Sequence, residues 1–130
     1  MLEFVTRDQF MSFGNVRRFD VVDVPSLGRV RIRSLNELER SKYESDHSDE
    51  TGELTEARML SAKRRLIALC VCNGAGEPIL TLEDVEAMAG KDGAFTGLMY
   101  DRCWQLCGFS REDIARVVGN LGTAPSDSSS

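Results

Sequence analysis

A run of seven consecutive apolar residues near the middle of the chain limits the folds that this sequence can adopt. Residues 66–72 are Leu-Ile-Ala-Leu-Cys-Val-Cys, and they follow the basic residues 63–65, Lys-Arg-Arg. A segment that is apolar on every side has to be covered on every side, so it belongs at the centre of a packed domain. Periodicity alone leaves a buried helix or a core strand open, and the basic residues before the run favour a helix over residues 56–72.

A β-hairpin is predicted before this segment. Residues 19–24 come close to alternating apolar and polar side chains, and residues 29–33, Arg-Val-Arg-Ile-Arg, alternate strictly. Between them, Pro25 and Gly28 are typical of a tight turn, because proline presets φ and glycine permits a positive φ. The alternation places Arg29, Arg31 and Arg33 on one face, which we expect to be a short solvated stripe.

Capping patterns predict the helices. The segment Ser34-Leu-Asn-Glu37 fits a capping box and predicts a short helix over residues 35–43, and Thr55 is placed to cap the helix that ends in the apolar run. Thr81 with Asp84, and Ser110 with Asp113, start two further helices; Gly108 ends the helix between them, over residues 94–106. Residues of these last helices expected to face inward are Leu82, Val85, Met88, Ala89, Ile114, Val117 and Val118.

These elements predict an α+β fold: an N-terminal β-hairpin followed by a small bundle of about four to five helices. Residues 1–15 are expected to be an N-terminal extension, and residues 16–120 a single domain. Residues 44–54 are acidic and carry His47, so they are expected to form a mobile loop. Residues 121–130 are expected to be a disordered tail.

Composition excludes several classes of protein. The chain has 130 residues, a formal net charge of −5 and a pI of about 4.9, with one cationic cluster at residues 63–65. A protein that binds nucleic acid needs a basic face to neutralise phosphates, which this composition does not favour. No segment approaches the roughly 18 apolar residues of a membrane span, and no signal peptide is recognisable. The four cysteines are therefore expected to be reduced thiols in a cytosol.

The cysteines raise the hypothesis of a zinc site, formed by Cys70, Cys72, Cys103 and Cys107. Cys103 and Cys107 share one side of a helix, but Cys70 and Cys72 diverge by about 200° if their segment is helical. Closed zinc sites usually draw a ligand pair from a turn, so burial of the thiols in the core is the favoured interpretation.

The sequence gives little indication of a catalytic site. His47 lies in the acidic loop, where it is expected to be solvated and lacks rigid partners for general-base chemistry. The acidic residues at 83, 84 and 86 are explained by the start of a helix, where they favour its dipole. The segment Asn73-Gly-Ala-Gly76 lacks the lysine of a phosphate loop. A helix-turn-helix over residues 81–107 would carry only Arg102 as a cation in its second helix. The chain is predicted not to be an enzyme.

Candidate contact residues come from the two most apolar helices. In residues 94–106 a core stripe is expected, made of Phe95, Leu98, Met99, Cys103 and Leu106. Tyr100 and Trp104 are four residues apart on another face, and they form either a second packing layer or a site for another protein. Leu66 and Leu69 raise the same question, because few helices of a small monomer are covered on all sides. We take Tyr100, Trp104, Leu66 and Leu69 as candidate partner-binding residues.

The order of these parts resembles the tail assembly chaperone family of long-tailed, siphovirus-type bacteriophages and prophages. The resemblance covers residues 16–120: the hairpin with Val24-Pro25 and residues 28–33, the helix at residues 35–40, and residues 62–71. It continues through the glycine-rich turn before Pro78 and residues 81–88, and then through the helix that ends at residues 106–108 before Ser110. Glycine at positions 93 and 97, and cysteine at 103 and 107, depart from many members.

The resemblance implies a function without catalysis and without cofactors. Such a chaperone binds the tape measure protein, keeps it soluble, helps to recruit tail tube subunits and self-associates. It acts in the host bacterial cytoplasm and is absent from the finished virion. Many members are also made in a longer, frameshifted form. The alternative is a small helical nucleic-acid-binding regulator of phage or bacterial origin.

Overall fold

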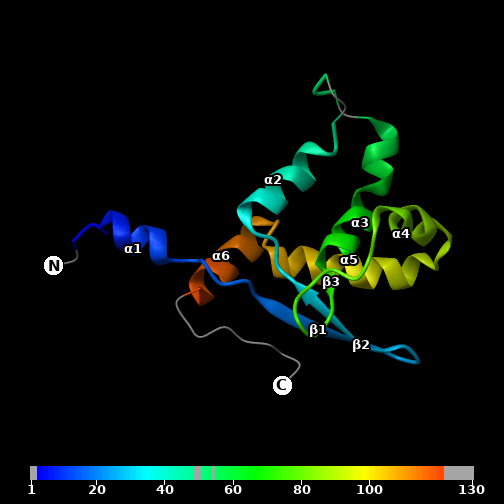
Figure 1. Cartoon of the computed structure of the whole chain (residues 1–130), viewed down its shortest axis with the longest axis horizontal. Helices are drawn as coiled ribbons and strands as arrows, with labels where there is room; N and C mark the ends of the chain where they lie inside the picture. Colours follow the sequence, from blue (N-terminus) through cyan, green and yellow to red (C-terminus); the bar gives the residue numbers. More distant parts are fainter. Residues whose placement is uncertain (1–2, 49–50, 54, 122–130) are drawn as a thin grey trace.

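The computed structural model describes residues 3–48, 51–53 and 55–121, which form a three-stranded antiparallel sheet packed against helices (Figure 1). The strands are β1 (Phe19–Val24), β2 (Gly28–Arg33) and β3 (Val71–Cys72). The α-helices are α1 (Arg7–Ser12), α2 (Glu37–Ser45), α3 (Glu56–Cys70), α4 (Leu82–Ala87), α5 (Gly93–Cys107) and α6 (Arg111–Asn120), and a short 3₁₀ helix, η1 (Met88–Gly90), follows α4. The predicted α+β class is confirmed.

The predicted hairpin is present. β1 and β2 pair in antiparallel register with Val24 opposite Gly28, and the N–H of Leu27 donates to the carbonyl of Val24 at 3.1 Å. Gly28 has a φ of 125°, as the turn chemistry predicted, but Ser26 also has a positive φ, 71°. Pro25 before it supplies the first corner of the turn, so serine is held in a conformation that usually favours glycine or asparagine.

The apolar run is a helix only as far as Cys70, and its last two residues form β3. Val71 lies opposite Ile32 of β2, and the N–H of Ile79 donates to the carbonyl of Val71 at 3.3 Å. The predicted helix through residue 72 was wrong at this end because the free edge of β2 offers backbone partners to a β-branched residue. The two-residue strand turns the predicted hairpin into a three-stranded sheet.

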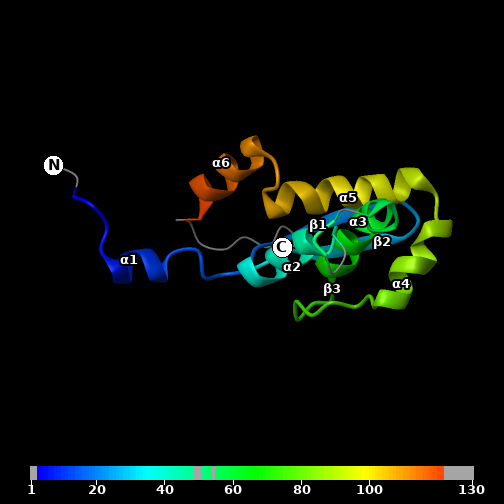
Figure 2. The ribbon, with the colours of Figure 1, turned by 90° about the horizontal axis from the view of Figure 1, so that it is seen from above.

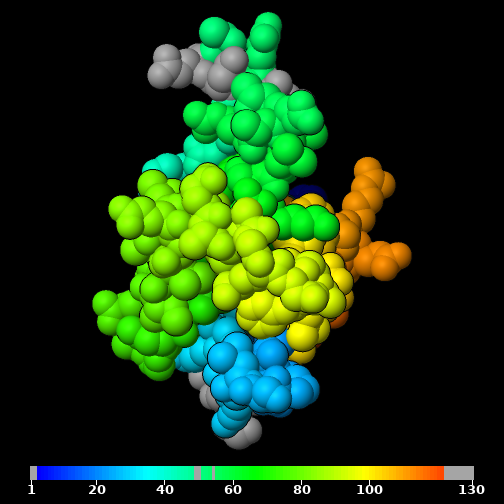
Figure 3. All heavy atoms as spheres, turned by 90° about the vertical axis from the view of Figure 1, so that its right-hand side faces the viewer, coloured from blue at the N-terminus to red at the C-terminus, as the bar shows by residue number. Residues whose placement is uncertain are grey.

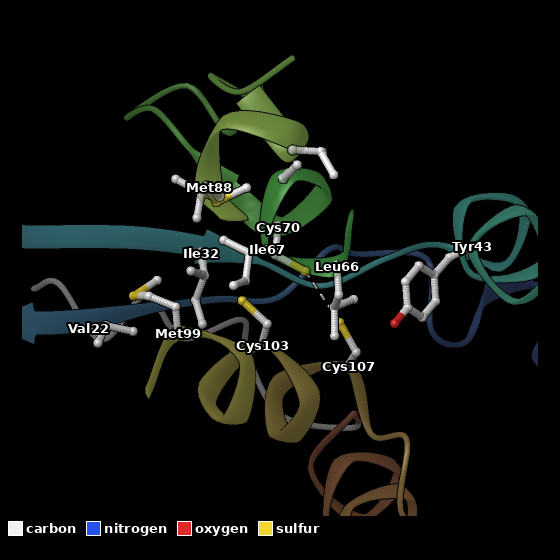
Figure 4. Close-up of a cluster of buried hydrophobic side chains, with 13 residues drawn as sticks. Val22, Ile32, Tyr43, Leu66, Ile67, Cys70, Met88, Met99, Cys103 and Cys107 are labelled. Carbon is white, nitrogen blue, oxygen red and sulfur yellow. Dashed lines mark hydrogen bonds between the residues drawn. The ribbon is translucent and has the colours of Figure 1, made fainter. Parts of the chain in front are cut away.

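The core lies between the sheet, α3 and α5, with α4 closing one side (Figures 2 and 4). Ile32 of β2 and Leu66 of α3 are completely buried, and Met99 of α5 reaches the same cluster. From the side shown in Figure 3, α3, α4 and α5 form one continuous face above the tip of the hairpin. The central position of α3 explains why its second half is apolar all round.

The arginine face of β2 is not the solvated stripe that was expected. Arg29 is exposed, but Arg33 is only 7% exposed, and its Nε donates to the carbonyl of Leu69 at 2.9 Å. Arg31 donates to the carbonyl of Gly74 at 2.7 Å and lies over the ring of Phe19. The last turn of α3 and the loop after β3 lie against this face, and their carbonyls accept the hydrogen bonds that the arginines donate.

The cap of α2 is Asn36, not Ser34 as the sequence predicted. The Asn36 side chain accepts from the N–H of Glu39, and the Glu39 side chain accepts from the N–H of Asn36. Ser34 is buried, and its hydroxyl accepts from the N–H of Arg18 at 2.9 Å, so it ties the sheet to the preceding segment instead. The caps at Thr55, Thr81 and Ser110 are confirmed.

Several residues expected to face inward are exposed. In α4 and η1 only Val85 and Met88 are buried, and in α6 only Val117 is buried. The α4 helix ends after six residues and tightens into the 3₁₀ turn, which changes the face of the residues that follow. The expected inward residues that are exposed instead are Leu82, Ala89, Ile114 and Val118, and Leu98 of α5 is also 40% exposed.

The structure describes only parts of the three segments that the sequence placed outside the packed domain. The expected N-terminal extension contains α1, which is capped by Thr6 and has no buried residue. The predicted acidic loop begins inside α2, and its residues 49, 50 and 54 lie outside the described part of the chain. Within it, His47 is half-buried rather than solvated, with its ring 4.9 Å from that of Tyr43. Of the predicted tail, residues 122–130 also lie outside the described residues.

Candidate protein-binding surface

The four cysteines do not form the hypothetical zinc site. Across the residues that the structure describes, no three His, Cys, Asp or Glu side chains are grouped so that they could hold a metal ion. Cys70, Cys103 and Cys107 meet in the core, whereas the thiol of Cys72 points to the sheet and contacts the carbonyl of Arg31 at 3.6 Å. The strand at residues 71–72 separates Cys72 from the other three, which the helical prediction had not anticipated.

A thiol pair bridges the two central helices. The sulfur atoms of Cys70 in α3 and Cys107 in α5 are 3.7 Å apart, and both residues are buried (Figure 4). A hydrogen bond to Cys103, together with burial, raises the pKa of the Cys70 thiol well above its usual value. A hydrogen bond to Cys70, together with burial, raises the pKa of the Cys107 thiol. These thiols are held in the neutral form and behave as small apolar side chains.

A cavity of about 310 Å³ lies between β1, α5 and α6, and ion pairs occupy its walls. Arg102 is 2.9 Å from Asp20, and Arg116 is 3.4 Å from Asp113. The first pair joins α5 to β1, whereas Arg116 and Asp113 both belong to α6. Arg116 joins α6 to α5 instead by donating to the carbonyl of Gln105 at 2.7 Å. Arg102 is the one cation that the helix-turn-helix hypothesis had for contacting DNA phosphates. Its guanidinium donates instead to Asp20 and to the carbonyl of Val21.

Tyr100 and Trp104 start a continuous row of aromatic rings. Their ring centroids are 5.5 Å apart, and Trp104 stacks on Phe109 at 4.7 Å. Phe109 is 5.7 Å from Tyr43 of α2, so the row links the C-terminal half of α5 to α2. All but Tyr43 are half-buried and rest on the core. We call Tyr100, Trp104, Phe109 and Tyr43 the aromatic row.

Three cationic side chains from α2 and α3 lie over these rings. The guanidinium of Arg40 is 4.3 Å from the centroid of Phe109. The ammonium of Lys63 is 5.2 Å from the ring centroid of Tyr100, and the guanidinium of Arg65 is 5.6 Å from that of Tyr43. Each separation lies within the range of a cation–π interaction. The row therefore combines apolar ring surface with local positive charge in a chain of net negative charge.

Tyr43 anchors the row. It is 4% exposed, and its hydroxyl donates to the carbonyl of Ala62 at 3.1 Å, which joins α2 to α3. Burial raises the pKa of Tyr43 to about 12, so the hydroxyl keeps its proton at neutral pH. Its place at the buried end of the row is structural, and the accessible part of the row is Tyr100, Trp104 and Phe109.

Sequence reasoning missed Phe109, although a signal for it was present. Gly108 has a φ of 71° at the end of α5, and the N–H of Phe109 donates to the carbonyl of Trp104 at 3.4 Å. A left-handed glycine followed by an apolar residue is the helix-ending motif in which that residue folds back onto the last turn. The pattern Cys107-Gly-Phe109 therefore predicts contact between Phe109 and the last turns of α5.

The four candidate partner-binding residues differ in how far their side chains are buried. Tyr100 and Trp104 lie together at the surface, half-buried. Leu69 is half-buried and packed against the core. Leu66 is completely buried, so its side chain has no surface to offer a partner in this conformation. The apolar character of residues 66–72 is explained by the intramolecular core.

The fold and this surface define a class: a small α+β protein with a row of aromatic rings, half-buried except at Tyr43, beside cationic side chains. No helix within the described residues is long and apolar enough to cross a bilayer. No protein-family model matches the sequence, and no curated protein is significantly similar to it. A solved structure does share the fold, that of the bacteriophage HK97 tail assembly chaperone. The two align with a TM-score of 0.51 and 18% identity, over 69% of this chain and 85% of that chain.

The resemblance seen in the sequence is thus confirmed at the level of the fold. The chain has the fold of a tail assembly chaperone of a long-tailed bacteriophage.

Proposed function

We propose that this chain is a phage tail assembly chaperone that binds the tape measure protein, keeps it soluble and helps to recruit tail tube subunits, without catalysing a reaction. The observation that supports this most strongly is the fold shared with the HK97 tail assembly chaperone over 85% of that protein. The aromatic row adds a contact surface of the kind that a binding protein needs. The role places the chain in the host bacterial cytoplasm and outside the finished virion.

The aromatic row suits an extended, partly helical partner. Half-buried tyrosine, tryptophan and phenylalanine offer large contact areas and lose little side-chain entropy on binding. The exposed ammonium of Lys63 beside them would meet acidic side chains of the partner. The accessible part of the row is three side chains, Tyr100, Trp104 and Phe109, so we expect modest affinity for one short segment of the partner. Copies of this chain that associate with one another would hold a long tape measure protein through avidity, because one bound copy raises the local concentration of the next.

Co-expression with the tape measure protein tests the proposal. The tape measure protein is to be expressed with and without this chain. The soluble fraction is analysed by size-exclusion chromatography with light scattering. Co-elution with several copies of this chain per tape measure protein supports the proposal, and an insoluble tape measure protein beside a free chain refutes it.

The alternative of a nucleic-acid-binding regulator makes a different prediction. Duplex DNA binding would weaken steeply with salt, because phosphate neutralisation releases counterions. Among the described residues, Arg102 is paired with Asp20, and Arg40, Lys63 and Arg65 lie over the rings of the aromatic row, so these cations do not favour the alternative. A DNA titration at two salt concentrations, run beside the co-expression, separates the two functions.

A further inference from the structure

One edge of the sheet is covered by side chains rather than by a strand. Within the described residues the strand order is β1-β2-β3, so β1 has a neighbouring strand on one side only. An edge strand offers a row of N–H and C=O groups with which an extended segment of another chain can pair. What lies against the outer edge of β1 therefore decides whether the sheet can add a strand.

The register shows which residues of β1 face this edge. The Ser34 N–H donates to the Arg18 carbonyl at 2.8 Å, which places a hydrogen-bonded pair one step before the start of β1. In an antiparallel pair of strands, hydrogen-bonded and non-hydrogen-bonded residues alternate. The backbone groups of Phe19, Val21 and Asp23 therefore point away from β2, towards the outer edge.

Val21, in the middle of this edge, has both of its backbone groups bonded to side chains. Its N–H donates to one carboxylate oxygen of Asp20 at 2.8 Å, and its carbonyl accepts from the guanidinium of Arg102 in α5 at 3.3 Å. The same guanidinium nitrogen donates to the other carboxylate oxygen of Asp20 at 2.9 Å, so the two side chains form one closed unit over Val21. A carboxylate oxygen and a guanidinium N–H thus make the two hydrogen bonds that a neighbouring strand would make.

This unit lies where another chain could reach the strand. Asp20 and Arg102 both line the cavity of about 310 Å³ between β1, α5 and α6, so this part of the edge borders open space. Their side chains are 29% and 34% exposed, and an ion pair that solvated adds little to stability. The main effect of the pair is therefore to occupy the backbone groups of Val21.

We propose that Asp20 and Arg102 form an edge lock, an autoinhibitory contact that closes β1 to extended segments of other chains. Charged side chains commonly protect edge strands in this way. Once the lock is removed, the extended segment that the chain itself provides is β1 of a second copy, which would pair antiparallel across a two-fold axis. The inference concerns the isolated chain and does not rest on the chaperone function.

The test compares variants of the isolated full-length chain by sedimentation velocity over a concentration series. Arg102→Ala removes the donor to the Val21 carbonyl, and Asp20→Ala removes the acceptor of the Val21 N–H without altering α5. Arg116→Ala is the matched control, because Arg116 lines the same cavity but belongs to α6 and donates to the carbonyl of Gln105. Circular dichroism checks that each variant is folded.

A proline on the edge distinguishes strand addition from other causes of association. Asp23 is exposed and its N–H faces the outer edge, where proline is tolerated but cannot donate to a further strand. Asp23→Pro is therefore made alone and in combination with each lock variant. Hydrogen exchange measured by NMR locates the contact, because pairing at this edge would protect the amides of Phe19 and Asp23 in the single lock variants.

We expect both lock variants to associate roughly tenfold or more tightly than the wild type and Arg116→Ala, because their β1 edge is open to pairing. The Phe19 and Asp23 amides should exchange more slowly in the associated form, and Asp23→Pro should return association to the wild-type level. The inference is overturned if the folded lock variants associate like the wild type. It is also overturned if the added association persists with Asp23→Pro or appears equally in Arg116→Ala. The tape measure protein is absent throughout, so the chaperone function is decided separately by the co-expression experiment.

Discussion

The guanidinium of Arg33 lies 3.1 Å from the carboxylate of Glu39, which joins the last residue of β2 to the first turn of α2. Arg17 contacts the same carboxylate at 2.8 Å, and it also donates to the carbonyl of Ser34 at 2.6 Å. Three segments of the chain therefore meet at one acidic side chain. Burial acts to raise the pKa of Glu39, but the hydrogen bond from Arg17, the cap at Asn36 and the two positive charges lower it overall.

Glu39→Gln should destabilise the fold by about 2 kcal/mol near neutral pH, because it leaves Arg33 without its anionic partner. Glutamine at this position keeps the reciprocal cap of α2, so the loss reports the charge. The pKa of Glu39 is lower in the folded chain, so its stabilisation is present above the unfolded-state pKa and is lost as the pH falls through the folded one. The difference from wild type in urea unfolding should therefore shrink below about pH 4. Glu37→Gln on the same helix is the control, and an equal effect there would contradict the assignment.

Gly76→Ala should cost about 2 kcal/mol, because Gly76 has a φ of 81° that favours glycine. A Cβ there would also lie 3.0 Å from the ring of Phe19, which packs under the loop. Gly74→Ala is the matched control in the same loop, since its Cβ would meet nothing within 4 Å. Chemical denaturation of the two variants should separate them clearly, and equal stability would mean that the loop does not hold this conformation in solution.

The elements of the fold that depend on local chemistry were predictable from the sequence. Pro25 and Gly28 marked the hairpin turn, and Thr55, Thr81 and Ser110 marked the starts of three helices. These signals act within a few residues, through backbone φ values and side-chain hydrogen bonds to the first helical turn. The cap at Asn36 was misplaced because Ser34 satisfied the same local pattern.

Features that depend on distant segments were not predictable in this way. Alternation showed that Arg31 and Arg33 share a face, but not that the last turn of α3 and the loop after Cys72 lie against that face. In the same way, Tyr100 and Trp104 could be paired from their spacing, whereas Tyr43 joins their row only through its contact with Phe109, just after the end of α5. Ile114 and Val118 are exposed because α6 packs on the body through the side that carries Val117, the buried residue of this helix.

The thiols of Cys70 and Cys107 should resist modification in the folded protein. Both are buried with raised pKa values, so little thiolate is present at pH 8 to attack an aromatic disulfide reagent. We expect reaction roughly 100-fold slower than that of a surface thiol introduced by Ala115→Cys on α6, with full reactivity after unfolding in urea. Rapid modification without urea would show that α3 and α5 separate readily. Metal analysis of the same sample tests the zinc hypothesis separately, because a zinc site would give stoichiometric zinc.

Lys63 and Lys91 provide a matched test of the aromatic row as the partner-binding surface. Both are exposed lysines whose ammonium faces an aromatic ring of α5, Tyr100 at 5.2 Å for Lys63 and Phe95 at 6.0 Å for Lys91. Of these two lysines, only Lys63 lies over a ring of the aromatic row, because Phe95 does not belong to that row. Lys63→Glu should weaken binding of a tape measure segment about fivefold, because it reverses the charge that an acidic partner meets, whereas Lys91→Glu should leave binding unchanged.

Trp104 makes this binding measurable, because it is the single tryptophan of the chain and lies in the middle of the row. Its fluorescence should change when a tape measure segment covers the row, and a titration of wild type and both lysine variants gives the three affinities. If both variants bind equally well and Trp104 fluorescence stays constant while the complex forms, the partner uses another surface of the chaperone. If the Lys63 variant alone is weakened, the cations over the rings select the acidic side chains of the partner.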